Sequence, residues 1–325
     1  MGIARGHHWI SQTYLARFTA DGRKESKLHV VDLAQRKTFD TAPANVCKER
    51  DFNTIESDKL APDELEKALS KIEDWVGQSL TKILSDPARI AWEDWNAILN
   101  YMALLATRNP IVRAHVTKKA SEDKFKKLSE ATNTPENFAA VVASAKAAGY
   151  LPHDMDIDYA TFRAELSPRR YAFEFPPGYF VPGEFDAMDS LLRNLGQRYW
   201  RVVKAPADSP GFVITDRPVT PFRRDGKHPS IQTPVDFGSD QTVVMFPLSP
   251  RFAGIGTPGI ANPTVPLGDI SRDFVAIANF TMIRICHQRV FAPDARFEVM
   301  PSQDLPITVG DDILNLFGEW EDLGD

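Results

Sequence analysis

Side chains that can exchange protons or donate hydrogen bonds are concentrated at the start of the chain. Residues 6–18 read Gly-His-His-Trp-Ile-Ser-Gln-Thr-Tyr-Leu-Ala-Arg-Phe. A histidine titrates near neutral pH and has two ring nitrogens, so His8 could be a general base, a proton donor or one metal ligand. Its structural alternative is a hydrogen bond to the backbone that pins this segment. Adjacent residues diverge on a helix or strand, so we expect His8 rather than His7 to be central. Gln12, in the same motif, is a candidate for substrate binding.

Asp216 is the second candidate for chemistry, because it follows an expected strand and precedes Arg217 and Pro218. It could orient His8, bind a cation or receive a proton. The alternative is a turn in which the carboxylate accepts local backbone N–H groups, as Asp-x-Pro sequences readily do. Only contact with His8 would favour the first interpretation.

Two further polar residues lie in apolar surroundings. Arg108 ends an apolar helix, where it could bind a phosphate or carboxylate, or only offset the exposed carbonyls of the helix end. Asn279 lies inside a largely apolar helix and could contact substrate, or only satisfy a hydrogen bond in the core. Weaker candidates are Arg17, Asp51 and Asn53, and Cys47 could be a nucleophile beside His8.

The elements that must position these residues change in type along the chain. Residues 27–33 and 37–40 predict an early hairpin, and an extended segment follows over 45–53. Apolar residues at steps of three and four predict a helix from Asp63, with Asp63 and Glu66 as its capping residues, and a second helix over 92–108. More polar helices are expected at 121–131, 135–148 and 184–197. Later strands are expected at 199–204, 211–215, 242–246, 251–255 and 289–291, with a helix over 273–284 before the last.

This order predicts an α+β protein in which a helical block is inserted between an N-terminal β element and a C-terminal mixed or antiparallel sheet. The expected parts are residues 1–60, 61–197 and 198–325, integrated into one domain. If the terminal β parts share one sheet, His8 could approach the turn after residues 211–215.

Composition limits the class of protein and its partners. The 325 residues are 43% hydrophobic and 25% charged, with a formal net charge of −6. This charge repels nucleic acid at long range, although a local patch could still bind it. Two cysteines are too few for a disulfide framework. With neither an apolar leader nor a stretch long enough to cross a membrane, we expect a cytoplasmic protein without a membrane span.

Four segments together are similar to one bacterial family, the domain-of-unknown-function family 4238. They are residues 8–18, 45–52, 214–219 and 246–250. The family's opening pattern is His-x-x-Pro-Gln-x-x-Leu-x-x-Phe, which this chain matches except for Ser11 in place of the proline. Its later Ser-Asp-Asn-Pro-like turn resembles Asp216 to Pro218, with Arg217 in place of the asparagine. Asn279 and the strand 289–291 resemble the family's ending. The resemblance covers most of the chain and implies a fold without an established activity.

Two classes of function follow from these residues. The first is a hydrolase, such as a phosphodiesterase or nuclease, in which His8 activates water, Asp216 orients it or holds a divalent metal ion, and Arg108 or Arg217 neutralises phosphate charge. A small phosphorylated molecule or nucleotide suits the acidic chain better than nucleic acid does. The second is a non-catalytic module that binds a ligand or protein partner, in regulation or defence. The hydrolase predicts that His8 and Asp216 meet in one water-accessible pocket with a basic residue, whereas the binding module permits them to lie apart with internal hydrogen bonds.

Overall fold

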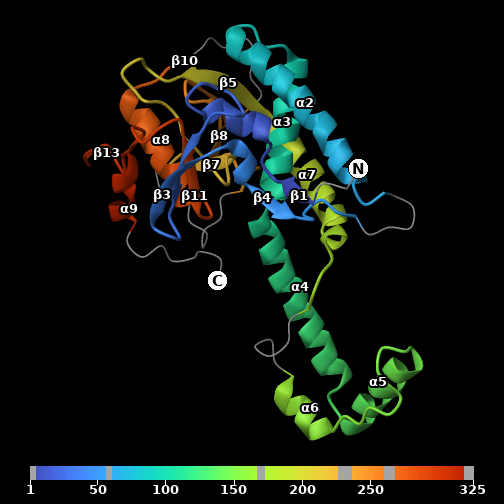
Figure 1. The fold of residues 1–325 in the computed structure, drawn as a ribbon. Helices are drawn as coiled ribbons and strands as arrows, with labels where there is room; N and C mark the ends of the chain where they lie inside the picture. The colour runs from blue at the N-terminus through green and yellow to red at the C-terminus, as the bar shows by residue number, and fades with distance from the viewer. Residues whose placement is uncertain (1–4, 56–60, 167–172, 226–235, 260–267, 318–325) are drawn as a thin grey trace. The chain divides into compact units, whose positions relative to one another are not determined.

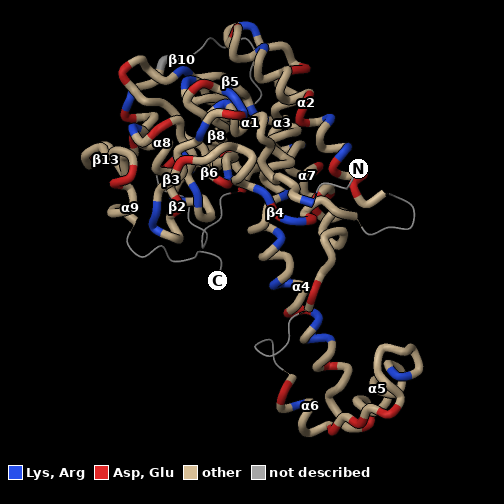
Figure 2. Tube along the Cα trace, viewed as in Figure 1, with Lys and Arg blue, Asp and Glu red and all other residues tan. Residues whose placement is uncertain are grey.

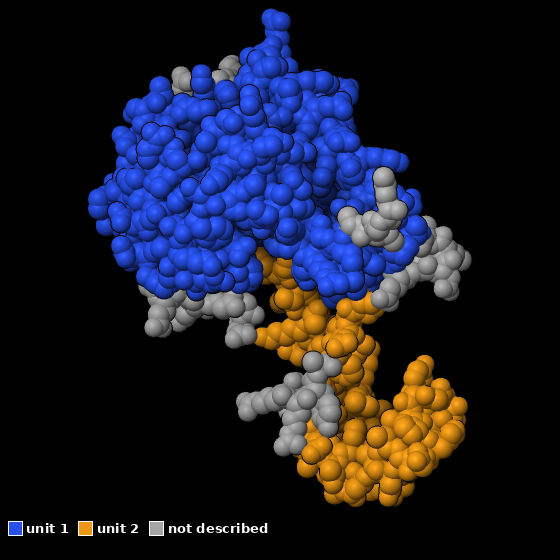
Figure 3. Space-filling model, viewed as in Figure 1, with its two compact units in different colours: residues 1–109, 177–325 blue, residues 110–176 orange. Residues whose placement is uncertain are grey.

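The computed structural model describes residues 5–55, 61–166, 173–225, 236–259 and 268–317. The chain divides into two compact units, residues 1–109 with 177–325 and residues 110–176 (Figure 3). The helical region expected over 61–197 is therefore shared between both units. Helices and mainly antiparallel sheets occupy different stretches of the chain, so the fold is α+β, as predicted.

Strands from both ends of the chain form one antiparallel sheet in the order β3-β2-β11-β6 (Figure 1). The strands are β2 Leu28–Asp32, β3 Lys37–Thr41, β6 Ile214–Thr215 and β11 Arg289–Ala292. β2 pairs with β3 as the expected hairpin, and also with β11 from more than 250 residues further along the chain. The N-terminal and C-terminal β parts thus share a sheet.

A second sheet has the order β10-β5-β9-β8-β7. Its strands are β5 Arg198–Lys204, β7 Thr220–Arg223, β8 Thr242–Ser249, β9 Phe252–Pro258 and β10 Gly268–Asp269. β10 runs parallel to β5, whereas the other neighbours are antiparallel, so this sheet is mixed. Short two-stranded pairings also join β1 Gly6–His8 to β4 Lys48–Arg50, and β12 Glu298–Val299 to β13 Thr308–Val309.

The expected strand over 211–215 is reduced to two residues. Gly211 has a φ of +105°, a conformation that L side chains rarely adopt, and a Cβ there would lie 2.0 Å from the carbonyl oxygen of Pro250. The amide of Phe212 donates to that same carbonyl, and the amide of Val213 donates to the side chain of Asn279. These two backbone amides therefore donate to groups other than a neighbouring strand, so residues 212 and 213 do not extend β6.

Helices of the first unit lie beside the sheets (Figure 1). They are α1 Gln12–Leu15, α2 Glu64–Ser85, α3 Trp92–Thr107, α7 Val181–Gly196, α8 Arg272–Arg284 and α9 Ile313–Leu316. Short 3-10 helices occur at η1 Ala16–Phe18, η2 Pro43–Asn45, η3 Pro177–Tyr179 and η4 Gly310–Asp312. The main helix-to-helix packing is of α2 on α3 and of α3 on α7.

The capping expected at the start of α2 is wrong in its details. Asp63 occupies the N-cap position but makes no side-chain capping bond. Its carboxylate instead pairs with Lys67, with 2.9 Å between Nζ and Oδ1. Glu66 accepts a hydrogen bond from the side chain of Asn53 rather than reaching back to the helix start. Tertiary contacts have thus taken both carboxylates that the capping pattern assigned to the helix.

The second unit contains three helices among its described residues, α4 Pro110–Ala131, α5 Pro135–Ala147 and α6 Tyr159–Glu165. The sequence predicts helix only from residue 121, whereas α4 begins at Pro110. Proline is well suited to a first helical turn, because its missing N–H has no intrahelical partner there. Pro110 therefore ends one helix and starts the next, and α6 was missed altogether.

The helices of the described residues lack an apolar stretch long enough to cross a lipid bilayer.

The apolar stripe of α2 is buried as its spacing predicts. Leu65, Leu69, Val76, Leu80 and Ile83 all lie in the larger hydrophobic core, whereas Ile72 is half-buried. Leu69 is only 4% exposed. This helix is therefore held mainly by packing against the rest of the first unit.

Replacing Leu69 with alanine should lower the free energy of unfolding by about 2–5 kcal/mol, because buried methyl groups are lost and a cavity remains. Ile72→Ala should cost less, because that side chain is only half-buried. Denaturant unfolding monitored by circular dichroism measures both. The exposed Lys71→Ala on the same helix is the control and should stay within about 0.5 kcal/mol of the wild type. Equal stability of Leu69→Ala and the control would contradict this packing.

Candidate functional site

The β1–β4 ribbon separates the two adjacent histidines. His8 lies opposite Lys48 in the antiparallel register, and His7 lies opposite Glu49. Because successive side chains of a strand point to opposite faces, His7 and His8 face different surroundings. His7 is buried, and its Nδ1 accepts a hydrogen bond of 2.9 Å from the backbone amide of Asn53. His7 therefore holds the chain after β4, while His8 lies on the other face.

His8 is half-buried and contacts the side chain of Gln12. The distance between its Nε2 and the amide nitrogen of Gln12 is 3.1 Å. An amide nitrogen can only donate, so Nε2 accepts, and the neutral ring carries its proton on Nδ1. In the described part of the chain, this buried Nδ1 has no hydrogen-bond partner. The structure thus brings His8 and Gln12 together.

The environment of His8 favours its neutral form. Burial lowers the pKa of His8 below its ordinary value, and the positive charge of Lys48 lowers it further. The nearby carbonyl groups of Val46 and Cys47 and the charge of Glu66 oppose this shift without reversing it. A neutral imidazole at neutral pH can accept a proton, which is the property that a general base needs.

Two exposed cations share the face of His8. Lys48 is directly opposite His8, and Arg50 is opposite Gly6, two residues before His8. Residues that face each other across antiparallel strands, and those two positions along a strand, project to the same side. Figure 2 marks lysine and arginine in blue along β4. Neither residue is among the candidates predicted from the sequence, although the alternation Lys-Glu-Arg over 48–50 is a signal that could have identified them.

Unusual backbone conformations flank β4 on both sides. Cys47 has a φ of 51° and Asp51 a φ of 59°, which is the left-handed region that non-glycine residues rarely adopt. The carbonyl of Cys47 accepts from the amide of Trp9, and the amide of Asp51 donates to the carbonyl of Arg5. These bonds continue the pairing of the two strands, so they hold the strained residues in place.

Cys47 itself is a poor candidate for a nucleophile. Its side chain is buried, and burial raises the pKa of the thiol well above its ordinary value. The negative charge of Asp216 raises this pKa further. The reactive form of cysteine is the thiolate, which this environment disfavours.

Arg108 lies in a buried polar network rather than facing solvent. Its Nε is 2.9 Å from a carboxylate oxygen of Glu184, and both side chains are 4% exposed. The same guanidinium donates to the amide oxygen of Asn53, whose nitrogen donates to Glu66. Arg108 thus joins α3, α7, α2 and the chain after β4, and part of its hydrogen-bonding capacity is used internally.

Glu73 is a residue of this region that the sequence analysis did not select. It lies two helical turns after Glu66 on α2 and next to the apolar stripe, a position where a carboxylate becomes partly buried. Burial, followed by the negative charge of Glu66, raises the pKa of Glu73 to about 7. Glu73 is therefore partly protonated at neutral pH, in contrast to an exposed glutamate.

Asp216 is buried and its carboxylate binds a backbone turn. One oxygen accepts from the amide of His287 at 2.8 Å, and the other accepts from Gln288 at 2.8 Å and Arg289 at 2.9 Å. Burial raises the pKa of Asp216, while these N–H groups act in the opposite direction. Neither a hydrogen bond nor an ion pair joins Asp216 to His8 among the described residues.

Arg217 and Asn279 also make internal hydrogen bonds. Arg217 donates to the carbonyl of Ile285 at 3.3 Å. Asn279 is fully buried; its nitrogen donates to the carbonyls of Gly211 and Glu298, and its oxygen accepts from the amide of Val213. In the structure, His8 therefore contacts Gln12. Among the described residues, no hydrogen bond joins either of them to Asp216, Arg217 or Asn279.

Within the described ranges, His, Cys, Asp and Glu side chains do not form a group of three or more that could hold a metal ion. At Asp216, for which binding a cation was one of the expected alternatives, both carboxylate oxygens already accept hydrogen bonds from three backbone amides.

Comparison with known proteins identifies the family of the chain. The family model described as a protein of unknown function, DUF4238, matches residues 6–296. No curated protein and no solved structure matches the chain. The match spans both the His8 motif and the Asp216 turn, as the resemblance in the sequence predicts. The chain belongs to the DUF4238 family.

Proposed function

We propose that the chain is a hydrolase acting on a small phosphate-containing molecule, with His8 as its general base. One observation carries this proposal: His8 shares a face of the β1–β4 ribbon with the exposed cations Lys48 and Arg50. A base beside positive charge suits attack of water on a phosphoryl group, whose negative charge would otherwise repel the nucleophile. The neutral state that burial and Lys48 favour for His8 supports the same role.

In this proposal the attacking water takes the place of the Gln12 amide at Nε2 of His8. The imidazole accepts a proton from that water as the water oxygen bonds to phosphorus, the bond from phosphorus to the leaving-group oxygen breaks, and that oxygen takes up a proton from solvent. The displaced Gln12 amide donates to a phosphate oxygen, as a substrate-binding residue. Lys48 and Arg50 neutralise the phosphate, a role for which the sequence offered Arg108 or Arg217. The reassignment follows from the buried ion pair of Arg108 and the internal hydrogen bond of Arg217.

Asp216 has an indirect role in the proposed site. Its carboxylate holds the turn at residues 287–289, and its charge is close enough to Cys47 to raise the pKa of that thiol. The carbonyl of Cys47 in turn accepts from the amide of Trp9, next to His8. Asp216 is thus a positioning residue for the ribbon, and the proposal needs no metal bound to it.

A net charge of −6 favours a small phosphorylated molecule or nucleotide over nucleic acid as the proposed substrate. We also propose a cytoplasmic location, because Cys47 and Cys286 are both unpaired, as is usual in a reducing compartment.

The alternative function is a non-catalytic module that binds a ligand or a protein. It is favoured by the internal hydrogen bonds of Arg108, Asp216 and Asn279, which a purely structural role explains. It is also favoured by the lack of a direct contact between His8 and Asp216 among the described residues, because the hydrolase mechanism expected from the sequence needs that contact. The two functions differ in what His8 does, since only the hydrolase needs its lone pair. Variants of the ribbon therefore distinguish them.

His8→Ala should lower kcat/KM by about 10²–10⁴-fold, the range that loss of a general base produces, with little change in Tm. The assay is hydrolysis of p-nitrophenyl phosphate, bis-p-nitrophenyl phosphate and nucleotides. In the wild type, kcat/KM should fall as pH drops through the lowered pKa of His8, below about 6.5, because protonation removes the base.

The matched control is His115→Ala, which removes an exposed histidine of the second unit and should leave the rate unchanged. Equal rates for His8→Ala and the wild type would reject His8 as the base. A wild type that hydrolyses no member of the panel but is stabilised by one of them would favour the binding module.

Lys48→Ala should raise KM for a phosphorylated substrate about fivefold at low salt, because a charge contact near the surface contributes about 1 kcal/mol. The difference from the wild type should shrink as salt rises. Steady-state kinetics at two ionic strengths measures both effects, and the exposed Lys71→Ala on α2 is the control. A KM that is independent of Lys48 would place phosphate recognition elsewhere.

Asp216→Asn should lower the free energy of unfolding by about 1.5–3 kcal/mol or more. The side-chain nitrogen of asparagine can only donate, so it cannot accept the backbone hydrogen bonds that one of the two carboxylate oxygens accepts in the wild type. Denaturant unfolding tests this, with the exposed Asp304→Asn as the control. A variant that keeps full stability but loses hydrolysis would contradict the positioning role and return Asp216 to the reaction itself.

A further inference from the structure

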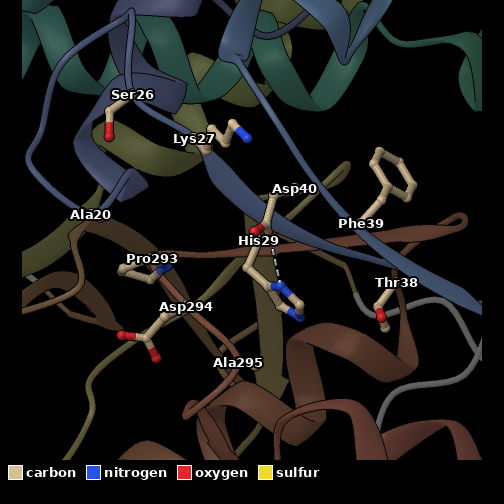
Figure 4. A pocket seen from close by; sticks show the side chains of 10 residues that line it. All are labelled: Ala20, Ser26, Lys27, His29, Thr38, Phe39, Asp40, Pro293, Asp294 and Ala295. Carbon is tan, nitrogen blue, oxygen red and sulfur yellow. Dashed lines mark hydrogen bonds and ion pairs between the residues drawn. The ribbon is translucent and has the colours of Figure 1, made fainter.

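His29 on β2 is held between two carboxylates from distant parts of the chain. Its Nδ1 is 2.9 Å from Oδ1 of Asp40 on β3, the residue directly opposite it in the hairpin. Its Nε2 is 2.7 Å from Oδ1 of Asp311 in η4. The imidazole is 11% exposed, and Figure 4 shows it beside Asp40 at the wall of a cavity.

This geometry requires a particular protonation state. An ionised carboxylate can only accept hydrogen bonds, and neutral imidazole has only one N–H. Both ring nitrogens of His29 face carboxylate oxygens at hydrogen-bonding distance, so both must donate. Loss of the ring proton would leave a nitrogen lone pair facing one of these oxygens, which replaces an attraction with a repulsion.

We propose that His29 is a proton-operated latch whose imidazolium ties the C-terminal segment 310–317 to the β2–β3 hairpin. Deprotonation releases the Asp311 end of that segment. The latch is independent of the proposed hydrolase, because it uses a different histidine and a different pair of strands.

Other contacts determine which part of the segment the latch controls. Arg36 donates to the carbonyls of Leu314 and Phe317 at 2.8 and 3.0 Å, and Phe317 stacks on Phe280. These contacts do not titrate near neutral pH, so they keep the end of α9 in place. At the Asp311 end, the one further side-chain bond among the described residues is the donation from Thr38 at 3.2 Å. Release is therefore local to η4.

The cavity beside His29 gives the release a structural consequence. Its volume is about 710 Å³, and His29, Thr38 and Asp40 are among its lining residues. When Asp311 leaves, Nε2 of His29 loses its partner at the wall of this cavity. The polarity of the wall then changes with the position of η4.

The charges around His29 set the direction of its response to pH. Asp40 faces it from β3 and Asp311 from η4, while Asp294, paired with Arg296, and Lys27 line the same cavity. Burial lowers the pKa of His29, but the bonds to Asp311 and Asp40 outweigh burial and raise the pKa above its ordinary value. The latch is therefore closed below about pH 6.5 and opens as pH rises through the raised pKa.

The test is hydrogen exchange of the backbone amides of residues 310–313 in the full-length protein at pH 6 and pH 9, corrected for the intrinsic effect of pH, with residues 314–317, which Arg36 and Phe280 hold, as the internal reference. Protection of residues 310–313 should fall about tenfold or more at pH 9, as expected for loss of a hydrogen bond between charged groups. Asp311→Ala, which removes the partner of His29, should be poorly protected at both pH values. The neighbouring exposed Asp312→Ala should behave as the wild type does.

Protection that does not depend on pH in the wild type would overturn the proposal, as would a pH dependence that survives in Asp311→Ala. Nitrogen NMR of the His29 ring provides a test that needs no variant. Protons on both nitrogens at pH 6 that are lost only above about pH 6.5 would support the latch. A ring that is already neutral at pH 6 would overturn it.

Discussion

The pairing of β2 with β11 is the interaction on which the rest of the first unit depends. It joins residues 29–32 to residues 289–292 and so closes most of the chain into one sheet. At one end of the pairing, the buried carboxylate of Asp32 contacts the guanidinium of Arg289 at 3.0 Å. At the same end, Asp216 binds the turn that leads into β11. The register of β2 on β11 and the turn at residues 287–289 are thus fixed together. Residues 6–18, which precede β2, are held relative to both.

A second constraint is the buried charge close to residues 6–18. Glu66 and Glu184 belong to the same hydrogen-bonded network as Arg108, and Glu73 is near enough to feel the charges of Glu66 and Arg108. Burying a charge is costly, so each group must find a partner or give up its charge. Glu184 pairs directly with Arg108, Glu66 accepts from Asn53, and Glu73 responds by a raised pKa. His8 is near enough to this network for the charge of Glu66 to act on its pKa, in the direction opposite to the charge of Lys48.

Elements with strong periodicity were predictable because a single interaction, burial of an apolar stripe, determines them. The α2 and α3 helices, the β2–β3 hairpin and the α8 helix all begin within a few residues of their expected positions. The failures occur where a distant partner competes with a local preference. Asp63 and Glu66 do not cap α2, because Lys67 and Asn53 bind them. The strand expected at 211–215 is short, because its amides donate to Pro250 and Asn279.

For the candidate site, the sequence by itself determined the family motifs and the α+β class, since these depend on residue order and on local periodicity. The contact of His8 with Gln12 came from the structure, although a separation of four residues makes it a local relation. Only the tertiary structure decided that Asp216 binds a backbone turn, that Arg108 is buried against Glu184, and that His29 lies between Asp40 and Asp311. Each of these depends on which donors and acceptors meet after the core forms. Hydrophobic burial brings such groups together without regard to their separation in sequence, and residue types alone do not specify the partner.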